Sequence, residues 1–223
     1  MSPWLALLGW GTLVGLDLVS VPQMMIARPI VAGAGAGLLL GDFEMGLRLG
    51  ILFELFQFDI LPVGAVRYPE YGPATIAAVA AGQSAGGALG VGLGAVVGLF
   101  TAMVGGASIH WLRRANGRAV QAVTARLEAG SSEALLRVHV ASLGRDALRA
   151  ALVTALGLGL AWVAARSLGG TLTVVGATVL AAAAGGAALA AGASGLLRLV
   201  GRGPGLGWFA AGLVAGAGVA WLR

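Results

Sequence analysis

The fold of this chain is decided by residues 28–76, RPIVAGAGAGLLLGDFEMGLRLGILFELFQFDILPVGAVRYPEYGPATI. Glycines recur at every fourth position, at 33, 37 and 41 and again at 46 and 50. This spacing lines one helix face with small residues, so that a second helix backbone can approach closely. Charged side chains are threaded through the same apolar run, and a carboxylate at a bilayer centre costs about 2.5–3.5 kcal/mol. The stretch therefore predicts closely packed membrane helices whose carboxylates line a protein interior or a water-filled path.

The composition of the whole chain indicates the same class of protein. Of the 223 residues, 58% are hydrophobic and 10% are charged, and the mean hydropathy is +0.92. Soluble domains carry about 25% charged residues, and transmembrane barrels need alternating rather than continuous apolar segments. We therefore predict an all-α integral membrane protein, a single membrane domain over residues 1–223 with roughly 7–9 transmembrane or re-entrant helices.

Several classes of function are disfavoured by the polar residues. The net charge is +5 and every positive residue is an arginine, but the chain is too apolar for a solvated nucleic-acid-binding face. There is no cysteine, and the two histidines, His110 and His139, lie far apart in the sequence. No nucleophile–base–acid set stands out. We expect a lipid-embedded chain that is not an enzyme and binds no nucleic acid, metal or cofactor.

The N-terminal half is expected to hold the core, residues 1–112. Residues 3–21 predict a first membrane helix, in which Asp17 is either an interfacial carboxylate at a helix end or part of a pathway. A second element over residues 26–40 is short for a full span and ends at a Gly41–Asp42 turn. A third element covers residues 45–61 and carries Glu54 and Asp59. The second of these elements fits a tilted or re-entrant helix.

Two further breaks organise this half. The proline- and glycine-rich residues 62–73 predict an irregular linker, which is tolerated at membrane depth where protein or a water-filled cavity covers it. Residues 71–112 contain no charged residue and would form a helix about 60 Å long, twice the hydrocarbon thickness. We expect this stretch to divide around Gln83–Gly87. Acids beside a broken helix favour a substrate site.

The C-terminal half is expected to be scaffold. Residues 113–149 hold seven of the 14 arginines and predict amphipathic helices broken near Gly130–Ser132. This segment is either a connector facing lipid headgroups or a docking surface for a soluble partner. Three apolar spans follow, over residues 147–165, 171–192 and 205–222, within a scaffold region of residues 147–223.

The carboxylates in the core suggest a polar substrate. The GAGAGLLLG run follows no predicted strand, so helix packing explains it better than nucleotide binding. Glu54 and Asp59 could accept hydrogen bonds from a substrate or relay protons. Sugar hydroxyls would suit them, because hydrogen bonds to ionised carboxylates are stronger than neutral ones. The isolated His139 fits an interfacial or structural histidine better than a phosphate carrier.

The order of short motifs resembles the membrane-spanning enzyme IIC component of the mannose/fructose/sorbose family of the bacterial phosphotransferase system. The blocks that carry the resemblance are ARPIVA at 27–32, LLGD at 39–42, GLRLGILFEL at 46–55, PVGAV at 62–66, YPEYGPATI at 68–76, AGQS at 81–84 and HVASLGRDALR at 139–149. The chain departs from the family at residues 60–64, where relatives often carry a Trp-x-Asn-Ile-Gly-like run. There, an amide that could bind sugar is missing.

The resemblance implies a sugar-translocating subunit in the bacterial cytoplasmic membrane. It pairs with an enzyme IID membrane subunit, as a trimer of such pairs, while cytoplasmic IIA and IIB proteins carry the phosphoryl group. Gln23 and Glu54 fall where family members place polar groups near the sugar, and Asp59 is a third candidate. The recurring motif and structural positions are Arg28, Pro29, Gly41, Asp42, Gly50, Gly64, Gln83, His139 and Arg149. Two alternatives are a non-transporting regulatory or structural subunit and a proton-coupled carrier that uses Glu54 as relay.

We expect residues 113–149 to face the cytoplasm, because cytoplasmic loops carry an excess of arginine and lysine. A cysteine introduced into this segment should react with a membrane-impermeant thiol reagent in inside-out vesicles and stay unmodified in intact cells. Labelling in intact cells would contradict this orientation.

Overall fold

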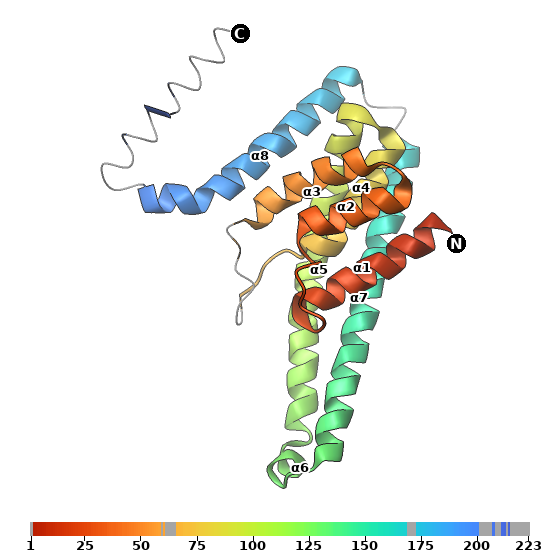
Figure 1. Cartoon of the computed structure of the whole chain (residues 1–223), viewed down its shortest axis with the longest axis vertical. Coiled ribbons are helices and arrows are strands. Elements are labelled where there is room, and N and C mark those ends of the chain that lie inside the picture. The colour runs from red at the N-terminus through yellow and green to blue at the C-terminus, as the bar shows by residue number, and fades with distance from the viewer. Residues whose placement is uncertain are drawn as a thin grey trace.

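The computed structural model describes residues 2–58, 60, 66–168 and 173–200, with isolated residues at 207, 211, 212 and 214. Asp59 and Gly64 lie outside the described residues, as does most of the predicted span over residues 205–222. Within the described part of the chain the structure is all-helical, which confirms the predicted fold class (Figure 1). The helices are α1 (Pro3–Val19), α2 (Pro29–Leu40), α3 (Phe43–Gln57), α4 (Tyr71–Ala85), α5 (Gly87–Gln121), α6 (Thr124–Glu128), α7 (Ser132–Leu168) and α8 (Val174–Val200).

Three of these helices, α5, α7 and α8, are long and apolar enough to cross a membrane. The others are shorter: α2 and α3 have 12 and 15 residues. At 1.5 Å per residue they measure about 18 Å and 23 Å, less than the hydrocarbon core of about 30 Å. Both are too short to span a bilayer as straight helices, as the sequence predicts for the element over residues 26–40.

The turn between α2 and α3 follows the sequence prediction. Gly41 ends α2 in a left-handed conformation with φ of 73°, which glycine adopts without a steric cost. Asp42 then caps α3, because its carboxylate accepts a hydrogen bond from the Met45 backbone N–H at 3.0 Å. The two helices consequently fold back on each other as a tight hairpin.

The repeated glycines make this hairpin close. A Cβ atom built on Gly46 would lie 2.5 Å from the Gly33 carbonyl oxygen and 2.9 Å from the Gly37 Cα. Gly50 likewise faces the backbone of Ile30, at 3.1 Å from its Cα. These approaches leave no room for a side chain, so the four-residue glycine spacing is confirmed as a helix-packing pattern.

The helix α4 forms the centre of the bundle. Its first twelve residues, Tyr71–Gly82, are all buried, and it contacts α1, α2, α3, α5 and α7. It ends at Ala85. Gly86, between the two helices, and Gly87, the first residue of α5, adopt positive φ values of 69° and 51°. The predicted break at Gln83–Gly87 is therefore confirmed.

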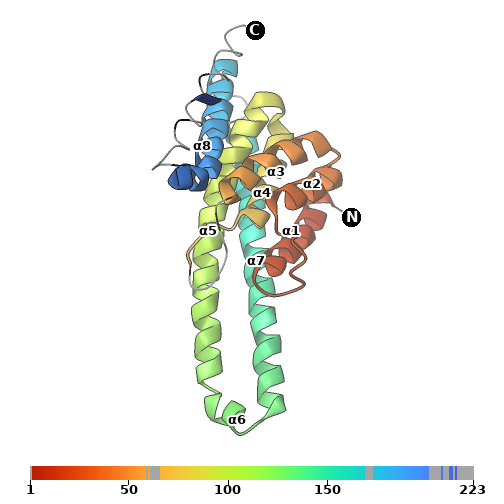
Figure 2. The ribbon, with the colours of Figure 1, turned by 60° about the vertical axis from the view of Figure 1, so that its left-hand side comes forward.

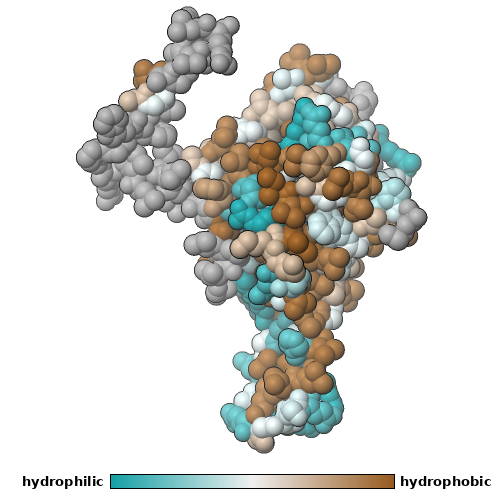
Figure 3. Space-filling view, viewed as in Figure 1, coloured by the Kyte–Doolittle hydropathy of each residue, from teal (hydrophilic) through white to brown (hydrophobic). Residues whose placement is uncertain are grey.

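The helices α5 and α7 extend beyond the bundle as a long antiparallel hairpin, with α6 at its tip (Figures 1 and 2). The predicted break near Gly130–Ser132 is present, since Gly130 has φ of 77° and α7 begins at Ser132. The arginine-rich residues are continuous with the apolar helices on either side, so that residue 147 lies inside α7. Hydrophilic and hydrophobic side chains are mixed at the tip of this hairpin (Figure 3).

The substitution Gly46→Ala should destabilise the protein by about 1–3 kcal/mol, because its methyl group would push the α2 and α3 backbones apart. The measurement is the thermal midpoint of the purified protein in detergent. Gly144→Ala is the matched control, since no atom lies within 4 Å of a Cβ at that position in α7. Equal midpoints for the two variants would contradict the packing argument.

Candidate functional site

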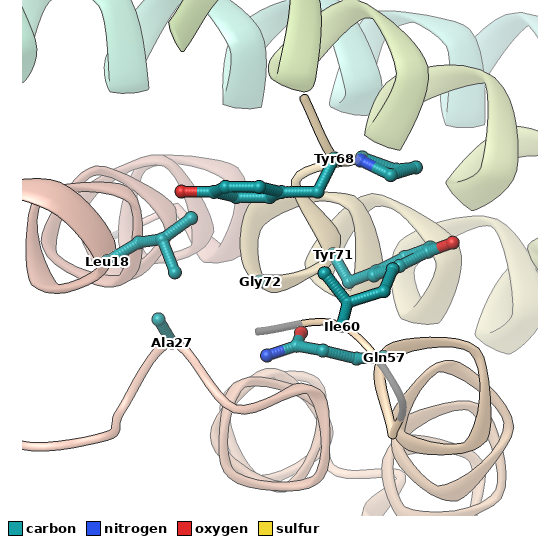
Figure 4. Close-up of a pocket in the computed structure, with 8 residues that line it drawn as sticks. Leu18, Ala27, Gln57, Ile60, Tyr68, Tyr71 and Gly72 are labelled. Atoms are coloured by element: carbon teal, nitrogen blue, oxygen red, sulfur yellow. The ribbon is translucent and has the colours of Figure 1, made fainter. Parts of the chain in front are cut away.

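Four helix ends meet around one depression in the structure. An inner cavity is lined by Leu18, Ala27, Gln57, Ile60, Tyr68, Pro69, Tyr71 and Gly72 (Figure 4). An adjoining outer cavity of about 320 Å³ shares four of these residues and adds Asp17, Gln23, Met25, Arg28 and Phe58. The inner cavity has a volume of only about 10 Å³. The outer cavity, which is mostly apolar with a few polar groups, is within the range of about 300–1,000 Å³ typical of small-molecule sites.

The amide of Gln57 occupies the wall shared by the two cavities. Gln57 is the last residue of α3 and is half-buried. In the close-up, its amide lies across the cavity from the Tyr68 ring, with Leu18 and Ala27 at one side (Figure 4). An amide both donates and accepts hydrogen bonds, so it suits a hydroxyl group. The sequence signal for Gln57 was weak, a three-residue spacing from Glu54 on the same helix face.

The segment between α1 and α2 carries Gln23 into the outer cavity in an unusual backbone conformation. Gln23 and Met25 have φ values of 59° and 65°, a region that costs a residue other than glycine about 1–3 kcal/mol. Asp17 stabilises this segment, because its carboxylate accepts hydrogen bonds from the backbone N–H groups of Met24 at 2.6 Å and Ala27 at 3.0 Å. Asp17 is 3% exposed. It is thus a buried anchor for the segment that follows α1.

Glu54 lies behind Arg28 at the edge of the outer cavity. Its carboxylate forms an ion pair with the Arg28 guanidinium and accepts a hydrogen bond from the Ile30 backbone N–H at 3.1 Å. Arg28 is the N-cap residue of α2 and Pro29 is the first residue of that helix. Arg28 is one of the described residues that line the outer cavity, whereas Glu54 lines neither cavity. Glu54 therefore positions Arg28, which faces the cavity directly.

The other predicted positions divide into packing residues and surface residues. Gly41, Asp42 and Gly50 shape the α2–α3 hairpin, as described above. Gln83 is exposed near the end of α4, and His139 is exposed on the outer part of α7. Neither of these two side chains lies at the cavity.

A buried ionic cluster lies directly behind the inner cavity. Arg149 forms a bidentate pair with Glu70, at 2.6 Å from Nη1 to Oε2 and 3.0 Å from Nη2 to Oε1. Its Nε donates to Asp146 Oδ1 at 2.8 Å, and its Nη2 donates to the Gly15 carbonyl oxygen at 3.2 Å. Ser20 donates a hydrogen bond to the second oxygen of Asp146. Glu70 and Asp146 are fully buried and Arg149 is 4% exposed.

This cluster fixes the wall of the inner cavity. Glu70 lies between Tyr68 and Tyr71, which both line that cavity, and its backbone N–H donates to the Ala102 carbonyl of α5 at 2.8 Å. The linker can approach α5 because α5 presents Gly105 to the Glu70 side chain and Gly106 to the Tyr68 carbonyl. Neither Glu70 nor Asp146 is among the site residues that the sequence predicts. The one local signal was the three-residue spacing of Asp146 and Arg149 on a helix.

Comparison with known proteins then assigns the chain to a family. A sequence profile described as the sorbose-specific IIC component of the phosphotransferase system matches residues 4–220. The chain belongs to this family. The resemblance inferred from the ordered motifs is therefore confirmed.

The IIC assignment agrees with a solved structure. The mannose transporter ManYZ, in a cryo-electron-microscopy complex with microcin E492 (MceA), is similar over 96% of this chain and 86% of the other chain. The TM-score is 0.55 and the sequence identity is 22%, so the likeness concerns the fold. No curated protein matches the chain significantly. With three helices of membrane-spanning length, this IIC component is a multi-pass membrane protein.

The substitution Arg149→Met should destabilise this IIC chain by about 3–5 kcal/mol, because it would leave two carboxylates buried without their cation. The matched control is Arg137→Met, which removes an exposed ion pair with Glu133 on the same helix and should cost at most about 1 kcal/mol. Thermal midpoints and size-exclusion profiles of the purified variants measure the difference. Equal stability of the two variants would contradict a structural role for the cluster.

Proposed function

We propose that this chain is the sugar-translocating subunit of a phosphoenolpyruvate-dependent phosphotransferase system. In this role it moves a hexose-type sugar whose phosphorylation is performed by partner IIA and IIB proteins, and it transfers no phosphoryl group itself. The observation that carries the proposal is the outer cavity at the four helix ends, which presents Gln23, Gln57 and Arg28. Membership of the IIC family supports it.

The cavity chemistry suits a neutral polyhydroxylated ligand. The amides of Gln23 and Gln57 can each donate to and accept from a hydroxyl group, and the Arg28 guanidinium donates. Tyr68 and Tyr71 line the inner cavity, which at about 10 Å³ is too small for a sugar ring, so the sugar would bind in the outer cavity. The Asp17 oxygens already accept backbone N–H groups, so Asp17 contributes by holding Gln23 in place.

The ion pair of Glu54 favours sugar binding over proton coupling. A proton relay needs a carboxylate that can take up and release a proton during the cycle. Here the Glu54 carboxylate is already engaged by the Arg28 guanidinium and the Ile30 backbone N–H. Glu54 therefore serves the proposed site by orienting Arg28, and Asp59 remains a candidate third sugar contact.

We further propose that the chain works in the bacterial cytoplasmic membrane with an enzyme IID subunit, as a trimer of IIC–IID pairs. The likeness to the mannose transporter ManYZ supports a two-component membrane complex. The surface also supports it, because α8 exposes large apolar side chains such as Val174 and Leu189, at 83% and 63% exposure. Lipid and a membrane partner are the environments that cover such a helix face.

The substitutions Gln57→Ala and Gln23→Ala should each lower sugar uptake about tenfold, because each removes hydrogen bonds to sugar hydroxyls. Uptake of radiolabelled mannose, fructose and sorbose is measured in cells that carry the IIA, IIB and IID partners. Gln83→Ala is the matched control, since this exposed glutamine lies away from the cavity. Glu54→Ala and Asp59→Ala are measured in parallel.

Unchanged uptake of all three sugars in Gln57→Ala, Gln23→Ala and Glu54→Ala would show that the cavity is not the sugar site. Absence of uptake by the wild-type chain with its partners, at normal expression, would instead favour the non-transporting alternative. Uptake that follows a proton gradient rather than phosphoenolpyruvate would favour a proton-coupled carrier.

A further inference from the structure

A second cavity lies on the other side of the Tyr68–Pro69 linker. It has a volume of about 340 Å³ and is lined by Arg67, Tyr68, Pro69, Met103, Gly106, Ala107 and His110. The Arg67 guanidinium lies 3.5 Å from His110 Nε2. Tyr68 and Pro69 also line the inner cavity of the candidate sugar site, so these two residues form a wall between the cavities.

Positive charge is concentrated around this second cavity. His110, Arg113 and Arg114 are three and four residues apart on α5 and therefore share one helix face. Arg67 lies beside the same face, since its guanidinium is 3.5 Å from His110 Nε2. Among the described residues, no carboxylate forms an ion pair with any of these four side chains. We call this group, Arg67, His110, Arg113 and Arg114, the cationic cluster.

The cluster is held in place by packing and hydrogen bonds. Arg113 donates to the Val66 carbonyl oxygen and to the Tyr68 hydroxyl, both at 3.2 Å, and its guanidinium lies 5.6 Å from the Tyr68 ring centroid. These two bonds leave further N–H donors of the guanidinium unused. Gly106 lets the linker lie against α5, because a Cβ there would be 2.2 Å from the Tyr68 carbonyl oxygen.

Like charges held together without a carboxylate are destabilised until an anion joins them. We propose that the cationic cluster is a binding site for a phosphate monoester or a phosphate diester headgroup. Guanidinium groups bind phosphate oxygens through two parallel hydrogen bonds, and several of them together favour a multiply charged anion. The neighbouring cavity gives such a group room to enter from the exposed Arg67 side.

Two sources could supply this phosphate. One is the phosphorylated sugar that is the product of the reaction under the proposed function, and this source rests on that proposal. The other is the headgroup of an anionic phospholipid, which basic pockets between membrane helices also bind. The two sources share the same recognition chemistry and differ in whether the ligand is soluble.

The test uses the full chain in nanodiscs. Calorimetric titration in phosphatidylcholine nanodiscs compares mannose 6-phosphate, inorganic phosphate and mannose. Native mass spectrometry compares the retention of phosphatidylglycerol with that of phosphatidylcholine. The variants are Arg67→Gln alone, which changes one exposed side chain, and Arg67→Gln with Arg114→Gln. The control is Arg48→Gln, which makes the same change in charge at an exposed arginine of α3 paired with Glu44.

We expect saturable binding of one phosphate-bearing probe, weakened about tenfold by Arg67→Gln and more by the double substitution, with Arg48→Gln unchanged. If the variants lose mannose 6-phosphate binding but still bind mannose, the ligand of the cluster is the phosphorylated product. If they lose phosphatidylglycerol retention, the ligand is the lipid headgroup. If neither probe binds the wild-type chain, or if both bind the double variant normally, the inference is wrong.

This outcome is separate from the sugar-uptake test. Normal uptake together with absent phosphate binding would overturn this inference and leave the proposed function standing. Phosphatidylglycerol retention that depends on the cluster, together with absent uptake, would do the reverse.

Discussion

The buried guanidinium of Arg149 holds together parts of the chain that lie far apart in the sequence. It donates hydrogen bonds to Glu70, which lies 79 residues earlier in the chain, and to Asp146 in its own helix. It also donates to the Ser108 hydroxyl in α5 and to the Gly15 carbonyl oxygen in α1. In a low-dielectric interior these bonds are strong, and separating them would leave charges buried without partners. The position of the linker, and with it one wall of the cavity, therefore depends on this residue.

The cavity arises because four helix termini meet at the same place, the C-terminal ends of α1 and α3 and the N-terminal ends of α2 and α4. Asp17 and Leu18 lie in the last turn of α1, Gln57 ends α3, and the linker precedes Tyr71 at the start of α4. Irregular backbone is tolerated within a membrane protein where other protein segments or water satisfy its polar groups. Here the Asp17 carboxylate accepts hydrogen bonds from two backbone N–H groups of the segment between α1 and α2. A carbonyl of α5 accepts a hydrogen bond from the Glu70 N–H of the linker before α4. The polar side chains that reach the outer cavity, such as Gln23 and Gln57, come from these helix ends and segments.

Features set by local chemistry could be predicted from the sequence, while features set by contacts across the chain could not. Gly41 and Asp42 specify a turn by themselves, and Gly86 and Gly87 specify a helix break, so both were found. The arginine-rich stretch looked like a separate segment because its polarity changes at residue 113, yet helices α5 and α7 continue through it. Pairing of Glu70 with Arg149 follows from tertiary packing alone. Gln57 has only its three-residue spacing from Glu54 as a sequence signal, which is too weak to predict a binding role.

The wall formed by Tyr68 and Pro69 separates two environments that suit chemically different ligands. On one side, the amides of Gln23 and Gln57 and the Glu54-paired guanidinium of Arg28 can bind hydroxyl groups. On the other side, guanidinium groups in the absence of a described carboxylate partner favour an anion. A sugar is neutral and its phosphate ester is an anion, so one set of side chains cannot bind both optimally. Because Arg113 donates to the Tyr68 hydroxyl, occupation of the cationic cluster would act on a residue that also lines the inner cavity of the candidate sugar site. The linker is thus the element through which the two cavities would be coupled.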